Sequence, residues 1–160
     1  MKKAGTYLIL FVLILSCQTH EVNEYEINNV FVSQTGQQKK NLKSSDQFIS
    51  LMYTDLYETS IPHNTLKNMQ RLLASFGDKN VIIERIAQNM LTDPLVNIPT
   101  DNVMRDNLPE FISETYNRFY TRQPSEAEIW YLQNLINNNA ELTVVEVYYA
   151  FLTSEEYKYY

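Results

Sequence analysis

Residues 111–124 read Phe-Ile-Ser-Glu-Thr-Tyr-Asn-Arg-Phe-Tyr-Thr-Arg-Gln-Pro, and the landmarks of this stretch occur once before in the chain, in the same order. The spacing between matched residues falls from 63 to 61 along the repeat, so each step implies one small loop deletion. An internal repeat of this period is typical of stacked helical units. The matched residues are Phe48-Ile49-Ser50 with Phe111-Ile112-Ser113, Tyr53 and Tyr57 with Tyr116 and Tyr120, Pro62 with Pro124, and Leu91-Thr92 with Leu152-Thr153.

The first unit, residues 44–93, is predicted to hold three helices because its apolar residues recur every three or four positions. Ser44 and Gln47 make a capping box at the first helix, Pro62 opens the second helix, and Gly77 is expected to end it as a C-cap residue. The third helix is expected to stop before Pro94. The expected apolar faces are Phe48, Leu51, Met52 and Leu56, then Leu66, Met69, Leu72, Leu73 and Phe76, then Val81, Ile82, Ile83, Ile86, Met90 and Leu91.

The second unit, residues 109–157, repeats this arrangement. Pro109 opens its first helix, and the pairs Ser125 with Glu128 and Thr143 with Glu146 are capping boxes for the next two. Residues 94–108 contain Pro94 and Pro99 and are expected to be a non-helical linker. The sequence therefore predicts an all-α fold, with two similar three-helix units packed as one small domain over residues 44–160. The expected apolar faces are Phe111, Ile112, Thr115, Tyr116 and Phe119, then Ile129, Leu132, Leu135 and Ile136, then Val144, Val147, Phe151 and Leu152.

The second unit resembles the helical unit of phycobilisome linker domains and of related bacterial secreted domains of unknown function. The shared pattern is an aromatic Tyr-x-x-Phe-x-x-Arg-x-Pro turn followed by a closing Leu-x-Ser-x-Glu-Tyr, and it is filled by Tyr116, Phe119, Arg122, Pro124, Ser154 and Tyr157. The first unit matches less closely, since it has no matching Arg and places Asp93-Pro94 at the closing motif. The resemblance implies an all-helical fold and a scaffolding role, and it does not carry pigment binding over.

The beginning of the chain has the pattern of a bacterial lipoprotein signal. Lys2 and Lys3 precede nine consecutive apolar residues, 7–15, a run too short to span a membrane but long enough for the core of a signal peptide. It ends in Ser16-Cys17, which resembles a lipobox, and Cys17 is the only cysteine. We therefore expect residues 1–16 to be removed and Cys17 to carry the lipid anchor. The alternative is an ordinary secretory signal with a chance cysteine.

Residues 17–43 are mostly polar and show no sustained period, so we interpret them as a flexible tether between the lipid and the domain. Residue 18 is Gln rather than Asp, which in bacterial lipoproteins favours the outer membrane. The expected location is therefore the cell envelope, as an outer-membrane lipoprotein, with the periplasmic and the surface-facing side both open.

The composition argues against several chemistries. A net charge of -6 disfavours binding to nucleic acid. One cysteine and two distant histidines, His20 and His63, do not supply a zinc site, and Gly77 alone cannot form a glycine-rich phosphate loop. Carboxylate pairs such as Glu110 with Glu114 and Glu126 with Glu128 are better interpreted as solvated helix faces and helix starts. We therefore expect no enzyme activity, no metal and no cofactor.

Aromatic residues are the candidate binding groups. Twelve tyrosines are many for 160 residues, and adjacent aromatics on a helix cannot both face one core. Tyrosine is favoured at interfaces because it joins apolar area to a polar tip. We expect a non-catalytic interaction or scaffold module that docks on an envelope protein; the alternative is a module that binds glycan or peptidoglycan. Packing between the two units would also explain these residues. The candidate surface is Tyr131, Tyr148, Tyr149, Tyr157, Tyr159 and Tyr160, with Trp130 nearby in the sequence.

The lipid anchor gives the first testable prediction. Replacing Cys17 by Ser removes the thiol that accepts the lipid, so Cys17→Ser should leave an uncut precursor or a soluble chain instead of a membrane-bound one. Cell fractionation and the intact mass of the protein measure both results. An unchanged fractionation and mass would contradict the lipoprotein interpretation.

Overall fold

The structure is a computed structural model that describes residues 41–159. The predicted signal peptide 1–16, Cys17, the tether as far as residue 40, and Tyr160 lie outside the described residues. The described part of the chain is helical and contains no strand beyond one isolated bridge between Leu42 and Tyr159. The all-α prediction is therefore confirmed.

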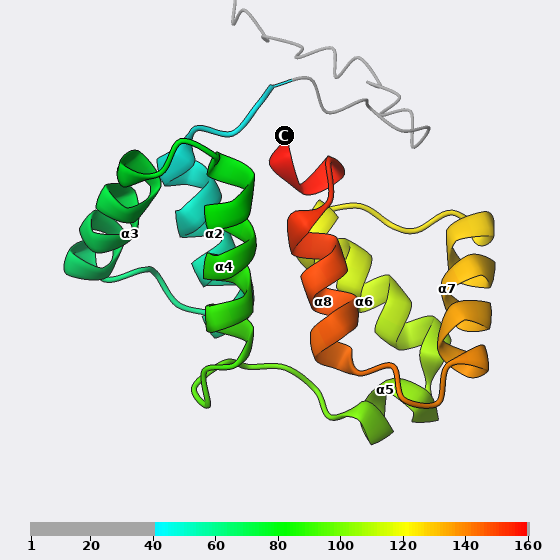
Figure 1. Cartoon of the computed structure of the whole chain (residues 1–160). Helices are drawn as coiled ribbons and strands as arrows, with labels where there is room; N and C mark the ends of the chain where they lie inside the picture. The colour runs from blue at the N-terminus through cyan, green and yellow to red at the C-terminus, as the bar shows by residue number, and fades with distance from the viewer. Residues whose placement is uncertain (1–40, 160) are drawn as a thin grey trace, which may run out of the picture. The chain divides into compact units, whose positions relative to one another are not determined.

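The first unit forms the three expected helices, α2 (Ser45–Tyr57), α3 (His63–Ser75) and α4 (Lys79–Leu91) (Figure 1). The Ser44 hydroxyl accepts a hydrogen bond from the Gln47 amide at 3.3 Å, and the Gln47 side chain accepts one from the Ser44 amide at 2.9 Å, so the predicted capping box is present. The β-branched run at residues 81–83 is helical, in agreement with its period.

The second unit comprises α6 (Leu108–Tyr120), α7 (Glu126–Asn138) and α8 (Val144–Thr153), followed by a 3-10 turn η1 (Glu156–Lys158). Both predicted capping boxes form here too, with Ser125 and Glu128 at α7 and Thr143 and Glu146 at α8. Pro109 lies in the first turn of α6, where its missing N–H leaves no helical bond unmade.

The prediction of a non-helical linker at residues 94–108 is wrong in part, because a short helix, α5 (Asp101–Asp106), forms within it. Pro99 precedes the N-cap residue Thr100, whose hydroxyl accepts a hydrogen bond from the Val103 amide, so the proline lies before the helix and does not interrupt it. From α5, Arg105 donates to the carbonyls of Ile136 in the last turn of α7 and of Asn139 just after it, which ties the linker to the second unit.

Gly77 does not have the predicted role of a C-cap residue. Helix α3 ends at Ser75, Phe76 follows in extended backbone, and Gly77 does not take the left-handed conformation. The Lys79 ammonium group instead donates hydrogen bonds to the carbonyls of Leu73 and Phe76, the latter at 2.8 Å. The Lys79 side chain, from helix α4, therefore bonds to carbonyls at the end of α3. In a helix that ends at a left-handed glycine, backbone N–H groups after the helix bond to such carbonyls instead.

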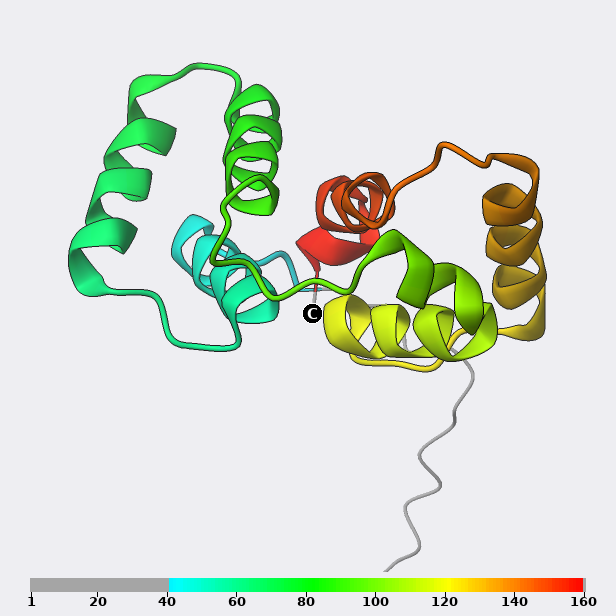
Figure 2. The ribbon, with the colours of Figure 1, turned by 90° about the horizontal axis from the view of Figure 1, so that it is seen from below.

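Four residues expected on apolar helix faces are exposed instead. Helices α3 and α7 lie on the outside of the domain, and α4 and α8 lie between them in Figure 1 and in Figure 2. Helix α3 buries only Leu73, and helix α7 buries only Ile136. An outer helix has fewer neighbours to cover its apolar side chains than a central one. In α4, Ile82 occupies the core position beside the exposed first-turn Val81. The four exposed residues are Leu72, Phe76, Val81 and Leu135.

The repeat is present in the structure at the level of single residues. The matched pairs Phe48 with Phe111 and Leu91 with Leu152 are all buried, as are Ile86 and Val147, which are separated by the same 61 positions as Leu91 and Leu152. Helices α2 and α6 both end at a left-handed, non-glycine residue, Glu58 at φ 54° and Thr121 at φ 52°. Matched core positions and matched helix ends in both units confirm the helical repeat.

One hydrogen bond is also repeated. The hydroxyl of Tyr57, at the end of α2, donates to Asp93 at 3.0 Å, and the hydroxyl of Tyr120, at the end of α6, donates to Ser154 at 2.8 Å. Asp93 and Ser154 each follow the third helix of their unit. The first unit has Asp93 where the second unit has Ser154 of the closing motif. The tyrosine hydrogen bond is therefore kept, and its acceptor is a carboxylate in the first unit and a hydroxyl in the second.

The two units are joined in two places. Helix α4 packs against helix α8, and residues after α8 contact helix α2 of the first unit. Tyr157 is completely buried, its hydroxyl donates to Asp55 of α2 at 2.7 Å, and its ring meets Phe48 edge-on at 5.4 Å. The Lys43 amide donates to the Lys158 carbonyl at 2.9 Å, which joins the two ends of the described range. Among the helices of residues 41–159, none is long and apolar enough to cross a membrane.

Candidate functional site: the outer face of helix α7

The structure does not bring the six candidate tyrosines together on one surface. Tyr148 and Tyr157 are buried in the core, which corrects their assignment as partner-binding residues, while Tyr149 and Tyr159 are partly covered. Tyr160 lies outside the described residues. Among the candidates that can be placed, Tyr131 alone is largely exposed, at 60%.

Tyr148 is buried because α8 presents it to α6. Its ring stacks on Phe111 at 6.0 Å and meets Phe119 edge-on at 4.8 Å, and its hydroxyl accepts a hydrogen bond from Arg118 at 3.4 Å. Burial raises the pKa of the Tyr148 hydroxyl above its ordinary value. The neighbouring Tyr149 points along a different direction of the helix and is only half-buried, so one residue of the pair joins the core.

The exposed aromatic group that remains lies on α7. Trp130 is 68% exposed, its neighbour Tyr131 is 60% exposed, and Leu135 is also exposed one turn further along. Helix α7 packs on α6 and turns Ile129, Leu132 and Ile136 toward the core. Positions 127, 130, 131, 134 and 138 therefore share the opposite side of the helix, because residues three, four and seven apart lie on one face.

No charged side chain occurs between Ile129 and Asn139, so this outer face carries only aromatic, aliphatic and carboxamide groups. The Asn134 carboxamide donates to the Trp130 carbonyl at 2.9 Å. Sequence reasoning noted Trp130 without placing it in the candidate surface. Its exposure could have been found from the period, because positions 129, 132 and 136 define the buried stripe and leave 130 and 131 outside it.

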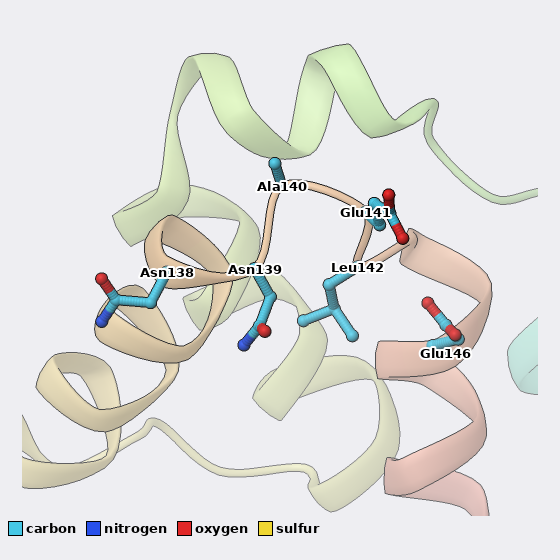
Figure 3. A pocket seen from close by; sticks show the side chains of 6 residues that line it. All are labelled: Asn138, Asn139, Ala140, Glu141, Leu142 and Glu146. Atoms are coloured by element: carbon cyan, nitrogen blue, oxygen red, sulfur yellow. The ribbon is translucent and has the colours of Figure 1, made fainter.

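A polar hollow of about 420 Å³ lies at the C-terminal end of α7 (Figure 3). Asn139, Leu142 and Glu146 gather on one side of the loop, while Asn138 lies at the end of the helix. The residues that line the hollow are Asn138, Asn139, Ala140, Glu141, Leu142 and Glu146.

Arg105 of α5 holds the loop beside this hollow. Its guanidinium donates to the carbonyls of Ile136 at 3.0 Å, Asn139 at 3.0 Å, Ala140 at 2.9 Å and Leu142 at 2.7 Å. A cation bonded to carbonyl oxygens past the end of a helix also complements the negative end of the helix dipole. The loop between α7 and α8 is thus fixed by a charged group from outside it.

The opposite end of α7 is fixed by Arg122. Its guanidinium forms two hydrogen bonds with each of two carboxylates, to Glu128 at 2.7 and 3.0 Å and to Glu156 at 2.6 and 2.8 Å. The Arg122 guanidinium also lies 4.9 Å from the centre of the Tyr116 ring. Hydrogen bonds from Arg122 lower the pKa of the Glu128 carboxyl to about 2, and bonds from Ser125 add to this effect. Glu128 is therefore an ion-paired carboxylate that also completes the capping box of α7.

A second hollow, of about 410 Å³, lies between the end of α2, the linker and α6. Arg118 crosses it, donating to Glu58 at 2.5 Å and to the Asn97 carbonyl at 3.1 Å. These bonds tie α6 of the second unit to the end of α2 in the first unit and to the linker. The guanidinium is thereby engaged in packing rather than turned toward a ligand.

The described residues do not gather a metal site. Across residues 41–159 there is no group of three or more His, Cys, Asp or Glu side chains placed to hold a metal ion. His63 is exposed in the first turn of α3, and His20 lies outside the described range. Of the carboxylates considered for acid–base chemistry, Glu110 accepts a hydrogen bond from Asn107 and Glu128 is paired with Arg122.

Comparison with known proteins gives no independent guide to function: no family model matches the chain, and neither the curated proteins nor the solved structures contain a match.

The Arg122 cluster makes stability depend on pH. The folded pKa of Glu128, about 2, lies below the ordinary value of 4.5, so its contribution is fully present above pH 4.5 and is lost as the pH falls toward 2. Allowing for solvent screening, we expect this contribution to be on the order of 1 kcal/mol. Urea unfolding at a series of pH values should show a steeper loss of stability for the wild type than for Glu128→Gln, which keeps the capping box.

Glu126→Gln is the matched control, because Glu126 is an exposed carboxylate in the same first turn of α7. It should retain the wild-type pH dependence. Equal acid sensitivity of the wild type and Glu128→Gln would contradict the role given to the Arg122–Glu128 pair.

Proposed function

We propose that this chain is a membrane-anchored lipoprotein whose helical domain is a non-catalytic docking module of the bacterial envelope. The lipobox-like segment ending at Cys17 supports the anchor, and the resemblance of the second unit to linker domains supports a scaffolding role. The single observation that carries the docking role is the pair Trp130 and Tyr131, exposed side by side on α7, while Tyr157 and four of the five phenylalanines in residues 41–159 are buried.

The energetics of such a pair favour an interface. Aromatic side chains bury large areas, and covering two rings of this exposure contributes on the order of 5 kcal/mol at about 25 cal/mol per Å². Part of this gain is offset by the entropy lost on association. Tryptophan and tyrosine are also the residue types that most often dominate binding energy at interfaces, whereas charged side chains are depleted at interface cores.

The surroundings of α7 support a docking role because they hold the helix in place before a partner arrives. Its first turn is held by the capping box and by the Arg122 cluster, and the loop after it is held by Arg105. A preorganised surface loses less conformational entropy on binding than a mobile one. The face is therefore a rigid platform, as a scaffold contact requires.

The two envelope partners considered from the sequence, a protein and a glycan, both fit an exposed aromatic face. Nucleic acid and other polyanions fit poorly, because the chain has a net charge of -6 and the outer side of α7 carries no basic residue. A catalytic role has no comparable support, since Glu128 and Arg118 are engaged in structural ion pairs.

Site-specific photo-cross-linking in cells tests the docking role directly. With benzoylphenylalanine in place of Tyr131 in the full chain, ultraviolet light should produce adducts that a mass shift and mass spectrometry detect. The control carries the same group in place of Phe76, which is 48% exposed at the end of the other outer helix, α3. Adducts absent at position 131, or equally abundant at both positions, would contradict a docking site on α7.

A further inference from the structure

We infer that the outer face of α7 and the hollow at its C-terminal end bind a neutral glycan that carries acetamido groups. This inference rests on the proposed docking function and names the chemistry of the partner. It uses two features that lie on the same helix, the exposed pair Trp130 and Tyr131 and the polar hollow lined by Asn138 and Asn139.

The aromatic pair supplies the apolar half of a sugar site. A pyranose ring has one face of C–H groups and a rim of hydroxyls, so it needs a flat apolar surface with polar groups at the edge. Trp130 and Tyr131 provide such rings, each with a polar tip that can bond to a hydroxyl. The absence of charge from residues 129–139 keeps this surface suited to an uncharged ligand.

Carboxamides supply the polar half. Tyr131 and Asn138 are seven residues apart on one face, which places them roughly 10 Å apart along the helix axis. An oligosaccharide of a few rings covers this distance. The Asn134 and Asn139 carboxamides donate to the carbonyls of Trp130 and Leu135, at 2.9 and 2.8 Å, so their nitrogens are held by the helix. Their oxygens are then placed as acceptors for ligand N–H or O–H groups.

The hollow at the end of this face favours an acetamido group over a plain hydroxyl. Leu142 is partly buried there, and its side chain lies between those of Asn139 and Glu146, as Figure 3 shows. Glu141 also lines the hollow. An acetamido group combines a methyl, which suits the leucine, with an amide N–H and C=O, which suit the asparagines and the carboxylates. The loop keeps this arrangement because Arg105 bonds to three of its carbonyls.

The charges around the hollow select against acidic sugars and phosphates. Its lining includes Glu141 and Glu146 and no basic side chain. Bonds from the Thr143 amide and hydroxyl lower the pKa of Glu146, so this group stays ionised at neutral pH. These carboxylates disfavour an anionic ligand, although the Arg105 guanidinium bonded to the loop offsets part of their charge. A neutral acetamido sugar can donate its N–H to a carboxylate.

Fluorescence provides the test, because Trp130 is the only tryptophan in the chain and reports on this face alone. The full chain, in a zwitterionic detergent without a sugar head group, is titrated with chitotetraose and with cellotetraose, which lacks acetamido groups. We expect chitotetraose to shift the emission of Trp130 to shorter wavelength in a saturable way. Cellotetraose should bind about tenfold or more weakly, since the acetamido contacts are lost.

Calorimetry on variants locates the binding site. Tyr131→Ala and Asn138→Ala should each weaken chitotetraose binding by about tenfold or more, because they remove the stacking ring and the carboxamide at the two ends of the site. Phe76→Ala, which removes an exposed aromatic from α3, should bind as the wild type does.

Three outcomes would overturn the inference: no saturable emission change with chitotetraose, equal affinity for cellotetraose, or binding that is unchanged in Tyr131→Ala and Asn138→Ala. Failure here is distinguishable from failure of the docking function. A protein adduct at position 131 without chitotetraose binding overturns only the glycan assignment. Absence of both the adduct and the fluorescence change overturns both.

Discussion

The burial of Tyr157 is the constraint on which the rest of this structure depends. The residue follows the last helix of the second unit, yet its hydroxyl bonds to Asp55 in the first unit and its ring contacts both Phe48 and Phe119, which belong to different units. Burial, together with the nearby Asp55 carboxylate, raises the pKa of the Tyr157 hydroxyl well above its ordinary value, so it remains a donor throughout the physiological range. Because Cys17 is the only cysteine, no internal disulfide can hold the two units together. Packing of α4 against α8 and the contacts of Tyr157 take that role.

This packing determines where apolar side chains remain exposed. The central helices use their aromatic residues against one another, as the contacts of Tyr116 and Tyr120 with Phe151 illustrate. The repeat places one outer helix in each unit, and each of these two helices buries a single residue. On α3 the large apolar residues that are exposed are Leu72 and, just after the helix, Phe76, whereas α7 exposes adjacent tryptophan and tyrosine rings. A duplicated fold therefore has two outer helices, and the sequence of α7 places exposed aromatic rings on one of them, which is the docking surface proposed above.

The sequence was informative where local rules decide the structure and misleading where distant contacts do. Helix ends at Ser44, Ser125 and Thr143 followed from capping boxes that span three residues. Helix α5 was missed because Arg105 bonds to carbonyls more than 30 residues further along the chain. Tyr148 and Tyr157 were placed at the surface because their partners lie on other helices, at Phe111 and at Asp55. The exposure of Leu135 depends on how many helices cover α7, which a single amphipathic pattern does not specify, whereas the period itself leaves Trp130 outside the buried stripe.

Urea unfolding of the full chain, followed by two signals, tests most directly whether Tyr157 makes one domain of the two units. Trp130 emission reports on the second unit, and far-ultraviolet circular dichroism reports on the helices of both. The wild type should unfold in a single transition at which the two signals coincide. Tyr157→Ala should lower the free energy of unfolding by about 3–5 kcal/mol, as expected for truncation of a large buried aromatic residue. Separate transitions in the wild type, or a Tyr157→Ala chain as stable as the wild type, would contradict this account.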